Sequence, residues 1–526
     1  MAAQPALLSD IEARATRTPG SPALIGSDGT LTYRQLLDGS EQLAGALVRL
    51  GIRPGHRVAV VAHKTTLVVM SMLAVMRAGA AYVPLDPRAP MNRMLDLIDD
   101  AATPVVVVTA AQDRELAAHL RHTGAARVLD PRTVEPSEPT GLPATIPGSA
   151  IALCFYTSGS SGRPKGVQLT YDGIDAFQTG FNELSRMDSE SRCLNVAALH
   201  FDVSLYDVLL PLRLGAVVHL GPPIPVADVI LGLITEHRIT HTSSVGSTMT
   251  MLADTSDDFR GFDLTSLRCL LTGAEVINPR TVQRWLAAAP QLTVINAYGP
   301  AEATCAVINH CISEREPDRT AHYPIGLPAP GTTIRFRTAD GHIDDDGPGE
   351  ILIAGRQLMA GYLHRPEEQE RAFVTDGGVR HYRTGDWGSR RPDGVILFAG
   401  RHDDEVKIRG YRVNLNEVKR ALETYPDVGA AVVAALPDGP YTLRLVCGVA
   451  SAAVDRPVLR DRPIERLKRL DADYELALRR HLAAIVPGYM LPADCWALPV
   501  LPVLSSGKPD VDLVRAWLDA AAGEPR

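Results

Sequence analysis

The sequence has 526 residues, more than one ordinary hydrophobic core holds, so at least two domains are expected. Hydrophobic residues make up 45% of the chain and charged residues 22%, which is typical of globular proteins. The formal net charge of −8 argues against a nucleic-acid partner, because nucleic-acid surfaces need a clustered basic face.

In the first third of the chain, helical patterns alternate with short runs of β-branched residues. This alternation predicts the α/β class, with mainly parallel sheets covered by helices. The helical patterns lie at Ser9–Thr18 and Tyr33–Leu50, and the β-branched runs at 57–62, 104–109 and 127–130.

The N-terminal stretch carries Asp10 and Glu12 and lacks the apolar core of a signal peptide. The apolar run Leu67–Met76 is too short to span a membrane and predicts a buried helix. Seven cysteines occur without a C-x-x-C pair, which favours reduced thiols over a disulfide framework or a zinc site. These features predict a cytoplasmic protein without a membrane partner.

The stretch "YTSGSSGRPKGV", Tyr156–Val167, follows the apolar run "AIALCF". Its glycines allow backbone N–H groups to approach an anion, its hydroxyls add donors, and Lys165 adds a positive charge. The spacing differs from the usual G-x-x-x-x-G-K-[ST] phosphate loop. Two interpretations therefore stay open, a loop that binds phosphate and a flexible surface turn.

Beyond Pro366 the pattern changes, because turn residues recur every few positions, as hairpins require. A large domain is therefore expected over residues 1–400 and a smaller α+β domain over residues 401–526. Within the smaller domain, Asp455–Arg480 is dense in charged residues and predicts a solvated helix and linker.

An ordered set of short blocks resembles the adenylate-forming superfamily, and specifically the amino-acid adenylation domains of nonribosomal peptide synthesis. The resemblance covers nearly the whole chain and implies the family's fold. That fold has a large N-terminal domain of mainly parallel sheets with a β-barrel-like subdomain, and a small mobile C-terminal domain. Besides the loop, the blocks are "LTYRQL" (31–36), "RAGAAYVPLDP" (77–87), "FDVSLYD" (201–207), "LLTGAEV" (270–276), "NAYGPAEAT" (296–304), "GEILIAG" (349–355), "YRTGDWG" (382–388), "GRHDDEVKIRGYRV" (400–413), "VPGYMLP" (486–492) and "LSSGKPD" (504–510).

By this resemblance the loop binds the β- and γ-phosphates of ATP. Glu302 is expected to hold Mg²⁺ on the phosphates together with Thr157, since Mg²⁺ prefers hard oxygen ligands and few protein contacts. Outside its block, Glu302 is read as ordinary surface charge. The phosphate-binding residues are expected to be Thr157, Ser158, Gly159, Ser160, Ser161, Gly162 and Lys165.

The resemblance implies that Tyr298 stacks on adenine, with Asn296 at the edge of the base and Ala297 and Gly299 nearby. Asp386 is expected to accept hydrogen bonds from both ribose hydroxyls, as an ionised carboxylate can. Arg401 is expected to contact the ribose or a phosphate. Alone, Asp386 fits an ordinary turn aspartate equally well.

Lys508 in "LSSGKPD" matches the family's catalytic lysine, which bridges the substrate carboxylate and the AMP portion. Outside this block, a lysine in such a loop is usually solvated. The block departs from the common Asn-Gly-Lys-Val-Asp-Arg form at three positions but keeps Gly507, Lys508 and Asp510. Two further departures are Ala301, where threonine is usual, and Ala274, where glycine is usual.

Asp202, in "FDVS", looks like the family's partner for the substrate α-ammonium, a charge-assisted pair. The alternative is an N-cap for the helix predicted at "SLYDVLLPL". Apart from Asp202 and Lys508, no residue carried over to the substrate site is charged, which predicts a neutral amino acid. The other expected substrate residues are Val203, Tyr206, Ser247, Leu271, Gly273, Ala274, Ala297, Cys305 and Ala306.

Only 18 residues follow Lys508, without a carrier motif, so a separate phosphopantetheine carrier protein is the expected acceptor. The need for a small accessory protein stays open. Asp403 matches the family's hinge, and Gly410 is expected to face the phosphopantetheine tunnel. The expected reactants are ATP with Mg²⁺ and an amino acid. The rivals are an acyl- or aryl-acid CoA ligase and a non-catalytic nucleotide-binding regulator.

Overall fold

The computed structural model describes residues 4–159, 164–438, 442–451, 458–459, 467–499, 502–503 and 510–522. It divides into two compact units. The larger unit comprises residues 1–87, 97–157 and 165–402, and the smaller unit comprises residues 88–96, 158–164 and 403–526.

A nine-stranded sheet forms one layer of the larger unit. Its six central strands, β1, β10, β9, β11, β12 and β13, run parallel to one another. At one edge β2 pairs antiparallel with β1, and at the other edge β14 pairs antiparallel with β13 and β15 with β14. In spatial order the strands are β15 (Leu327–Pro328), β14 (Ile308–Ile312), β13 (Thr293–Tyr298), β12 (Cys269–Gly273), β11 (His241–Ser243), β9 (Arg192–Asn195), β10 (Val217–Leu220), β1 (Pro22–Gly26) and β2 (Gly29–Thr32).

A seven-stranded sheet is also parallel at its centre, with antiparallel strands β8 and β19 at one edge. Its strands in spatial order are β19 (Gly361–Tyr362), β8 (Lys165–Thr170), β7 (Ile151–Thr157), β4 (Ala81–Leu85), β3 (Arg57–Val61), β5 (Val105–Val107) and β6 (Arg127–Leu129).

A third sheet of the larger unit is antiparallel throughout, as the hairpin signals predict. Its strands are β17 (Ile343–Asp344), β16 (Thr332–Arg337), β18 (Gly349–Gly355), β21 (Val379–Arg390) and β20 (Phe373–Asp376), with β22 (Ile396–Arg401) paired to β21. Two parallel-centred sheets with helices confirm the predicted α/β class.

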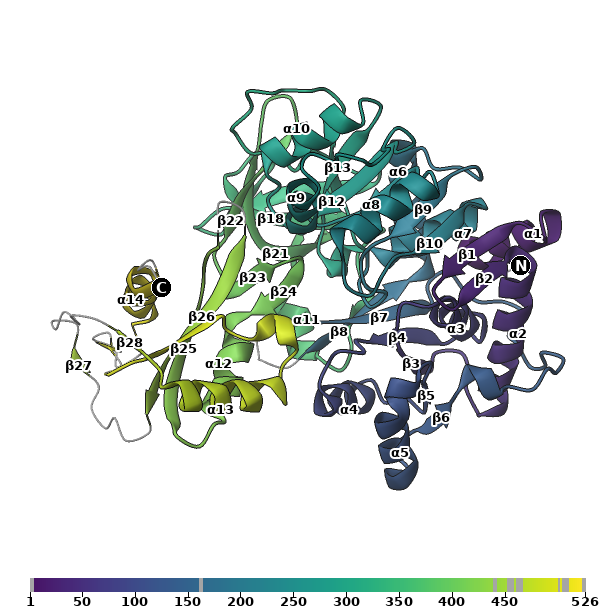
Figure 1. The fold of residues 1–526 in the computed structure, drawn as a ribbon, viewed down its shortest axis with the longest axis horizontal. Helices are drawn as coiled ribbons and strands as arrows, with labels where there is room; N and C mark the ends of the chain where they lie inside the picture. The colour runs from purple at the N-terminus through teal and green to yellow at the C-terminus, as the bar shows by residue number, and fades with distance from the viewer. Residues whose placement is uncertain are drawn as a thin grey trace. The chain divides into compact units, whose positions relative to one another are not determined.

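Helices cover the two parallel-centred sheets. A capping box of Thr32 and Gln35 starts α2, and the Thr170 side chain caps α6. Figure 1 shows α8, α9 and α10 together beside β12 and β13. The helices are α1 (Ala6–Arg17), α2 (Tyr33–Arg49), α3 (Thr66–Arg77), α4 (Met91–Asp100), α5 (Arg114–Thr123), α6 (Tyr171–Ser185), α7 (Leu210–Leu214), α8 (Ala227–Glu236), α9 (Gly246–Thr255), α10 (Pro279–Ala288) and α11 (Pro366–Arg371).

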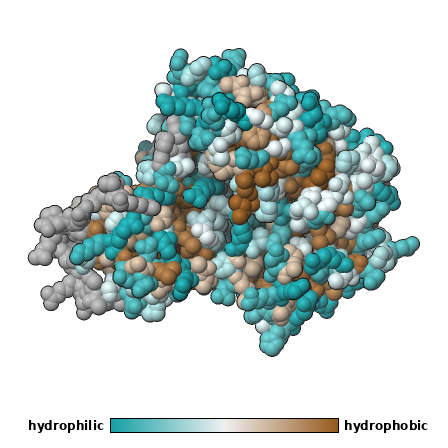
Figure 2. Space-filling view, in the orientation of Figure 1, coloured by the Kyte–Doolittle hydropathy of each residue, from teal (hydrophilic) through white to brown (hydrophobic). Residues whose placement is uncertain are grey.

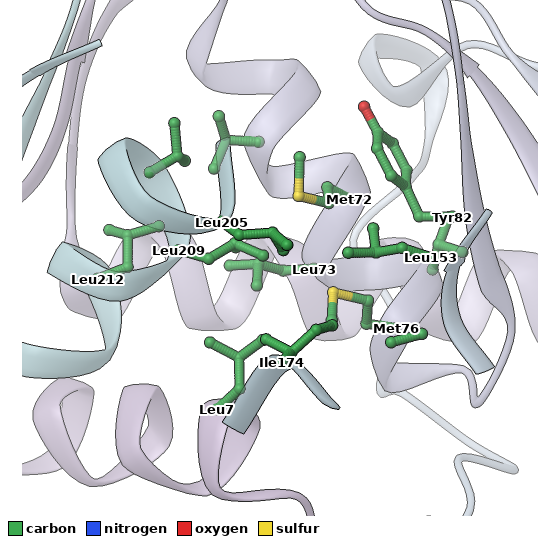
Figure 3. Packing of buried hydrophobic residues seen from close by; sticks show 14 of the residues in the cluster. Leu7, Met72, Leu73, Met76, Tyr82, Leu153, Ile174, Leu205, Leu209 and Leu212 are labelled. Carbon is green, nitrogen blue, oxygen red and sulfur yellow. The ribbon is translucent and has the colours of Figure 1, made fainter. Parts of the chain in front are cut away.

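The main core joins helices and strands that are far apart in the sequence. Met72, Leu73 and Met76 of α3, inside the run predicted as a buried helix, point toward Ile174 of α6 and Leu205 (Figure 3). Leu205 begins a short π-helix, η3 (Leu205–Leu209), that leads into α7. The segment predicted as one helix is therefore a π-turn followed by a short α-helix.

The smaller unit has its own core of strands and helices. Its hairpin is β23 (Glu405–Ile408) with β24 (Tyr411–Asn414), and its main sheet has the order β25 (Val428–Pro437), β26 (Leu443–Ser451), β29 (Asp494–Ala497), β28 (Lys468–Arg469). Strands β27 (Val458–Leu459) and β30 (Pro502–Val503) pair with each other, and the helices are α12 (Leu415–Glu423), α13 (Ala472–Ala483) and α14 (Val511–Ala522).

The surface and the thiols agree with the composition. Figure 2 shows a mainly hydrophilic surface on the larger unit, with hydrophobic residues gathered beside α8. All seven cysteines are free thiols. None of the helices in the described ranges is long and apolar enough to cross a membrane.

Candidate active site

The site residues of the larger unit meet at the carboxyl ends of parallel strands. Strand β12 ends at Gly273 and β13 at Tyr298, while Asp202 follows β9. Parallel strands present their carboxyl ends at one edge of a sheet, where open α/β sheets bind ligands. Glu302 lies just beyond β13, in the short 3-10 turn η4 (Ala301–Ala303).

The predicted phosphate loop connects β7 to β8 in the second sheet. Thr157 ends β7 and is paired across the hairpin with Lys165, the first residue of β8. The Thr157 Oγ1 atom is buried and makes no hydrogen bond to any residue in the described ranges. Ser158 and Gly159 are both buried, and Ser158 Oγ donates to the Arg412 carbonyl at 3.0 Å.

Glu302 has no exposed surface. It follows β13 of the nine-stranded sheet and contacts Lys165 of β8 in the seven-stranded sheet. Its Oε1 atom lies 3.7 Å from Lys165 Nζ and accepts a hydrogen bond of 2.7 Å from the Tyr362 hydroxyl. Lys165 Nζ also lies 4.6 Å from the centre of the Tyr362 ring. The structure therefore brings Lys165 and Glu302 together and adds Tyr362, which the sequence analysis missed.

This arrangement fits a hydrated metal held mainly by a nucleotide. Glu302 and Thr157 both border Lys165, and they offer a buried carboxylate and a hydroxyl that makes no hydrogen bond to a described residue. Across the described ranges, no cluster of three or more His, Cys, Asp or Glu side chains suits a metal ion. Mg²⁺ bound here would take most of its ligands from phosphates and water, as it does in phosphoryl-transfer sites.

Asp386 is buried, and its carboxylate accepts two short hydrogen bonds. The Tyr298 hydroxyl donates to Oδ2 at 2.6 Å, and Arg401 Nη1 donates to Oδ1 at 2.8 Å. Burial, reinforced by the charge of Asp386, holds the pKa of Tyr298 well above its usual value, so this phenol stays a donor. A carboxylate has about four acceptor positions, so Asp386 keeps capacity for ribose hydroxyls.

Strand alternation separates the candidate nucleotide residues from a candidate substrate residue. Asn296 and Tyr298 point to one face of β13, whereas Ala297 points to the other face. The Asn296 amide donates to the Pro324 carbonyl at 2.8 Å. Gly299 follows the strand and has no room for a side chain, because a Cβ atom would lie 2.5 Å from the Cys305 carbonyl oxygen.

Asp202 lies in the turn before η3, close to another candidate substrate residue. Burial, followed by the charges of Asp202 and Asp207, holds the pKa of the Cys305 thiol well above its usual value. Ser204, rather than Asp202, precedes the helix, and within the described residues its side chain makes no capping hydrogen bond. The Asp202 carbonyl accepts a hydrogen bond of 2.9 Å from the Leu205 N–H, so the N-cap and the substrate-partner interpretations of Asp202 both stay open.

The other candidate substrate residues differ in burial. Val203 is half-buried and packs against the main core, which also includes Ala306 and Leu271. Tyr206 has no exposed surface, because its ring packs edge-on against Phe181 and its hydroxyl lies 3.5 Å from Cys269 Sγ. Gly273 pairs in register with Ala297.

Ser247 contacts Glu275, the residue that follows Ala274 in the sequence. The Ser247 backbone N–H donates to Glu275 Oε2 at 2.7 Å, which holds a carboxylate at the start of α9. Ala274 adopts a left-handed conformation with φ of 65°. This conformation explains why glycine is usual at this position, since only glycine adopts it without a steric cost.

Asp207 is a buried carboxylate that the sequence analysis did not identify. It accepts hydrogen bonds from Asn195 Nδ2 at 3.0 Å and from Ser243 Oγ at 2.6 Å. Burial raises its pKa to about 6, although these hydrogen bonds and the charge of Lys64 oppose the shift. Asp207 therefore ties η3, which follows Asp202, to the ends of β9 and β11.

Some predicted residues cannot be placed in this site. Ser160, Ser161, Gly162 and Lys508 lie outside the described residues. Asp403 accepts a hydrogen bond from the Glu405 N–H at 3.2 Å, just before β23. Gly410 adopts a positive φ of 81° in the turn between β23 and β24.

Comparison with known sequences identifies relatives over almost the whole chain. The family model for the AMP-binding enzyme matches residues 11–363. Nonribosomal peptide synthetase 32 of Fusarium pseudograminearum is 31% identical over 96% of this chain, which spans only 6% of that protein. Novobiocin biosynthesis protein H of Streptomyces niveus is 32% identical, over 98% of this chain and 84% of that protein.

Solved structures share the fold. The amide bond synthetase McbA of Marinactinospora thermotolerans superimposes with a TM-score of 0.83 at 24% identity, over 98% of this chain and 99% of that one. An artificially fused adenylation–PCP di-domain from Klebsiella oxytoca, NpsA-ThdA, gives a TM-score of 0.78 at 22% identity, with 94% of each chain covered.

Proposed function

The chain belongs to the family of AMP-binding enzymes, of the adenylation type found in nonribosomal peptide synthetases, and from this premise we propose its reaction. It activates a neutral amino acid with ATP to form aminoacyl-AMP and pyrophosphate. It then transfers the aminoacyl group to the phosphopantetheine thiol of a separate carrier protein. The synthetase and di-domain relatives support a carrier as acceptor.

The observation that carries the proposal is the convergence, around the end of β13, of anion-binding and cation-binding groups from the three sheets of the larger unit. Lys165 provides a positive charge beside buried Glu302, and Tyr298 with Arg401 holds the Asp386 carboxylate. Asp202 lies near Cys305, where its negative charge suits the α-ammonium of an amino acid. An acid without an amine would leave this carboxylate without that partner, which disfavours the CoA ligase alternative.

Each group has a role in adenylation. Asp386 orients the ribose, Lys165 neutralises phosphate charge, and Asp202 positions the amino acid so that a carboxylate oxygen attacks the α-phosphorus as pyrophosphate leaves. Lys508 is proposed to stabilise the charge on that phosphorus. Glu302 and Thr157 would hold Mg²⁺, which would supply further charge neutralisation on the phosphates. The carrier thiolate then attacks the acyl carbon and displaces AMP.

Delivery to the carrier is proposed to need a second pose of the C-terminal domain. We assign the hinge to Asp403, at the boundary between residues 1–400 and 401–526. In that pose Gly410 would serve the phosphopantetheine tunnel while Lys508 withdraws. These assignments follow from the family resemblance.

The test is ATP–pyrophosphate exchange across the twenty common amino acids and common β-amino acids, with Lys508→Ala as the matched inactive variant. One neutral amino acid should drive exchange, and Lys508→Ala should reduce it by orders of magnitude. A carrier protein, free CoA and simple amines then compete as acceptors. If CoA or an amine is the preferred acceptor, the second half-reaction is that of a CoA ligase or an amide synthetase and not carrier loading. If no amino acid supports exchange, the proposal is refuted.

A further inference from the structure

Asn309 of β14 has a buried side-chain amide that makes no hydrogen bond to the described part of the chain. The residue is only 7% exposed, and neither Nδ2 nor Oδ1 has a hydrogen-bond partner among the residues that the structure describes. Buried side-chain amides in proteins almost always have partners, because leaving a donor or acceptor unpaired is costly. A buried, unpaired amide therefore calls for a ligand or another explanation.

The strand register places Asn309 in line with two candidate substrate residues. Asn309 is paired directly with Ala297 across β14 and β13, and Ala297 is in register with Gly273 of β12. Residues opposite each other in neighbouring strands point to the same face of a sheet. Because strands lie about 4.8 Å apart, Asn309 is about one strand spacing from Ala297 and about two from Gly273.

Small residues lie on the β12–β13 side of this amide, whereas its partner on the β15 side is Leu327. The three residues in register, Gly273, Ala297 and Asn309, form a row across the sheet. Gly273 contributes only backbone to this row, because a Cβ atom there would lie 2.4 Å from the Ala297 carbonyl oxygen. Ala297 contributes only a methyl group. On α6, which packs on the same face through Phe177 and Phe181, a Cβ atom at Gly180 would meet only Pro330 Cδ, at 3.5 Å.

We propose that Asn309 is a specificity-determining residue that hydrogen-bonds the side chain of the amino acid, an inference that rests on the proposed function. An amide has both a donor and an acceptor, so the group that satisfies it must also donate and accept. Hydroxyl and carboxamide groups do both, whereas a carboxylate only accepts and an ammonium only donates. The substrate class is therefore an amino acid with a neutral hydroxyl or carboxamide side chain.

The order of the strands agrees with this orientation. Asp202, the proposed partner of the α-ammonium, follows β9, and the sheet continues through β11, β12 and β13 to β14. A substrate held by its ammonium at Asp202 would thus extend its side chain along the row from Gly273 to Asn309. The competing explanation is an ordered water that satisfies the amide permanently.

Three pairs of nearly isosteric amino acids test the proposal by pyrophosphate exchange, namely threonine against valine, tyrosine against phenylalanine, and asparagine against leucine. In the pair that fits the site, the wild-type protein should prefer the polar member in kcat/KM by about 10- to 100-fold, because an apolar side chain would leave the amide unpaired. Asn309→Leu should shift this ratio by at least about tenfold toward the apolar member.

Thr272→Val is the matched control, since Thr272 Oγ1 is also buried without a partner among the described residues but points to the opposite face of β12. It should leave the ratio unchanged. A wild-type preference for the apolar members, or an unchanged ratio in Asn309→Leu, would overturn the inference while exchange itself upholds the proposed function. If Asn309→Leu fails to fold, the inference is tested by the wild-type preference and by the same kcat/KM ratio measured for Asn309→Ala. Exchange with no amino acid would refute the proposed function, and the inference with it.

Discussion

Replacing Tyr298 with phenylalanine tests the group that holds Asp386. The change removes one hydroxyl and keeps the aromatic ring that is proposed to stack on adenine. The lost hydrogen bond is 2.6 Å long and ends on a buried carboxylate, a class of bond that contributes about 1.5–3 kcal/mol. Arg401 still pairs with the other oxygen of Asp386, so the carboxylate charge is not left without a partner.

We therefore expect Tyr298→Phe to lower the free energy of unfolding of the larger unit by about 2 kcal/mol. The KM for ATP should rise about five- to tenfold, because about 1 kcal/mol of ribose binding depends on the orientation of Asp386. The KM for the amino acid should not change. Since the pKa of Tyr298 lies well above its usual value, these effects should not depend on pH between about 6 and 9.

Urea unfolding and pyrophosphate exchange at varied ATP concentration measure the two effects. Tyr33→Phe is the matched control, because the buried Tyr33 hydroxyl donates to a neutral group, the Ala216 carbonyl, at 2.7 Å. It should cost about 1 kcal/mol of stability and leave the KM for ATP unchanged. If Tyr298→Phe loses no more stability than Tyr33→Phe and binds ATP normally, the assigned role of Tyr298 is wrong.

Three further changes test other parts of the molecule. Asp202→Asn keeps an acceptor but loses the charge, so KM for the amino acid should rise at least about tenfold in exchange assays; an unchanged KM with lower thermal stability would return Asp202 to a structural role. Asp207 has a pKa of about 6 in the folded protein, above its unfolded value, so its contribution to stability is present below about pH 4 and is lost as pH rises through 6. Urea unfolding should show wild type losing up to about 3 kcal/mol relative to Asp207→Asn between those pH values, and a constant difference would contradict the buried-carboxylate assignment. Asp403→Pro fixes φ near −65° and should retain most exchange but slow transfer to a carrier; equal losses in both assays would indicate general damage to folding.

Local pattern was sufficient for much of the fold. The alternation of helical and β-branched segments predicted the α/β class. Each segment buries one face, so apolar residues recur along it with the period of a helix or of a strand. The blocks around Lys165, Glu302, Tyr298 and Asp386 indicated the family, since each is a short run of consecutive residues in or next to a strand. The sequence could not decide between an N-cap and a substrate partner for Asp202, because both need the same residue at the same place.

The tertiary structure alone decided which distant residues meet. Tyr362 hydrogen-bonds Glu302 across 60 positions of the chain, and Asp207 accepts hydrogen bonds from donors on two separate strands. The burial of Tyr206 and the unpaired amide of Asn309 depend on which helix covers which face of the sheet. Side-chain spacing along one strand cannot carry this information, because pairing partners and covering helices come from remote segments whose register is set by the packed core.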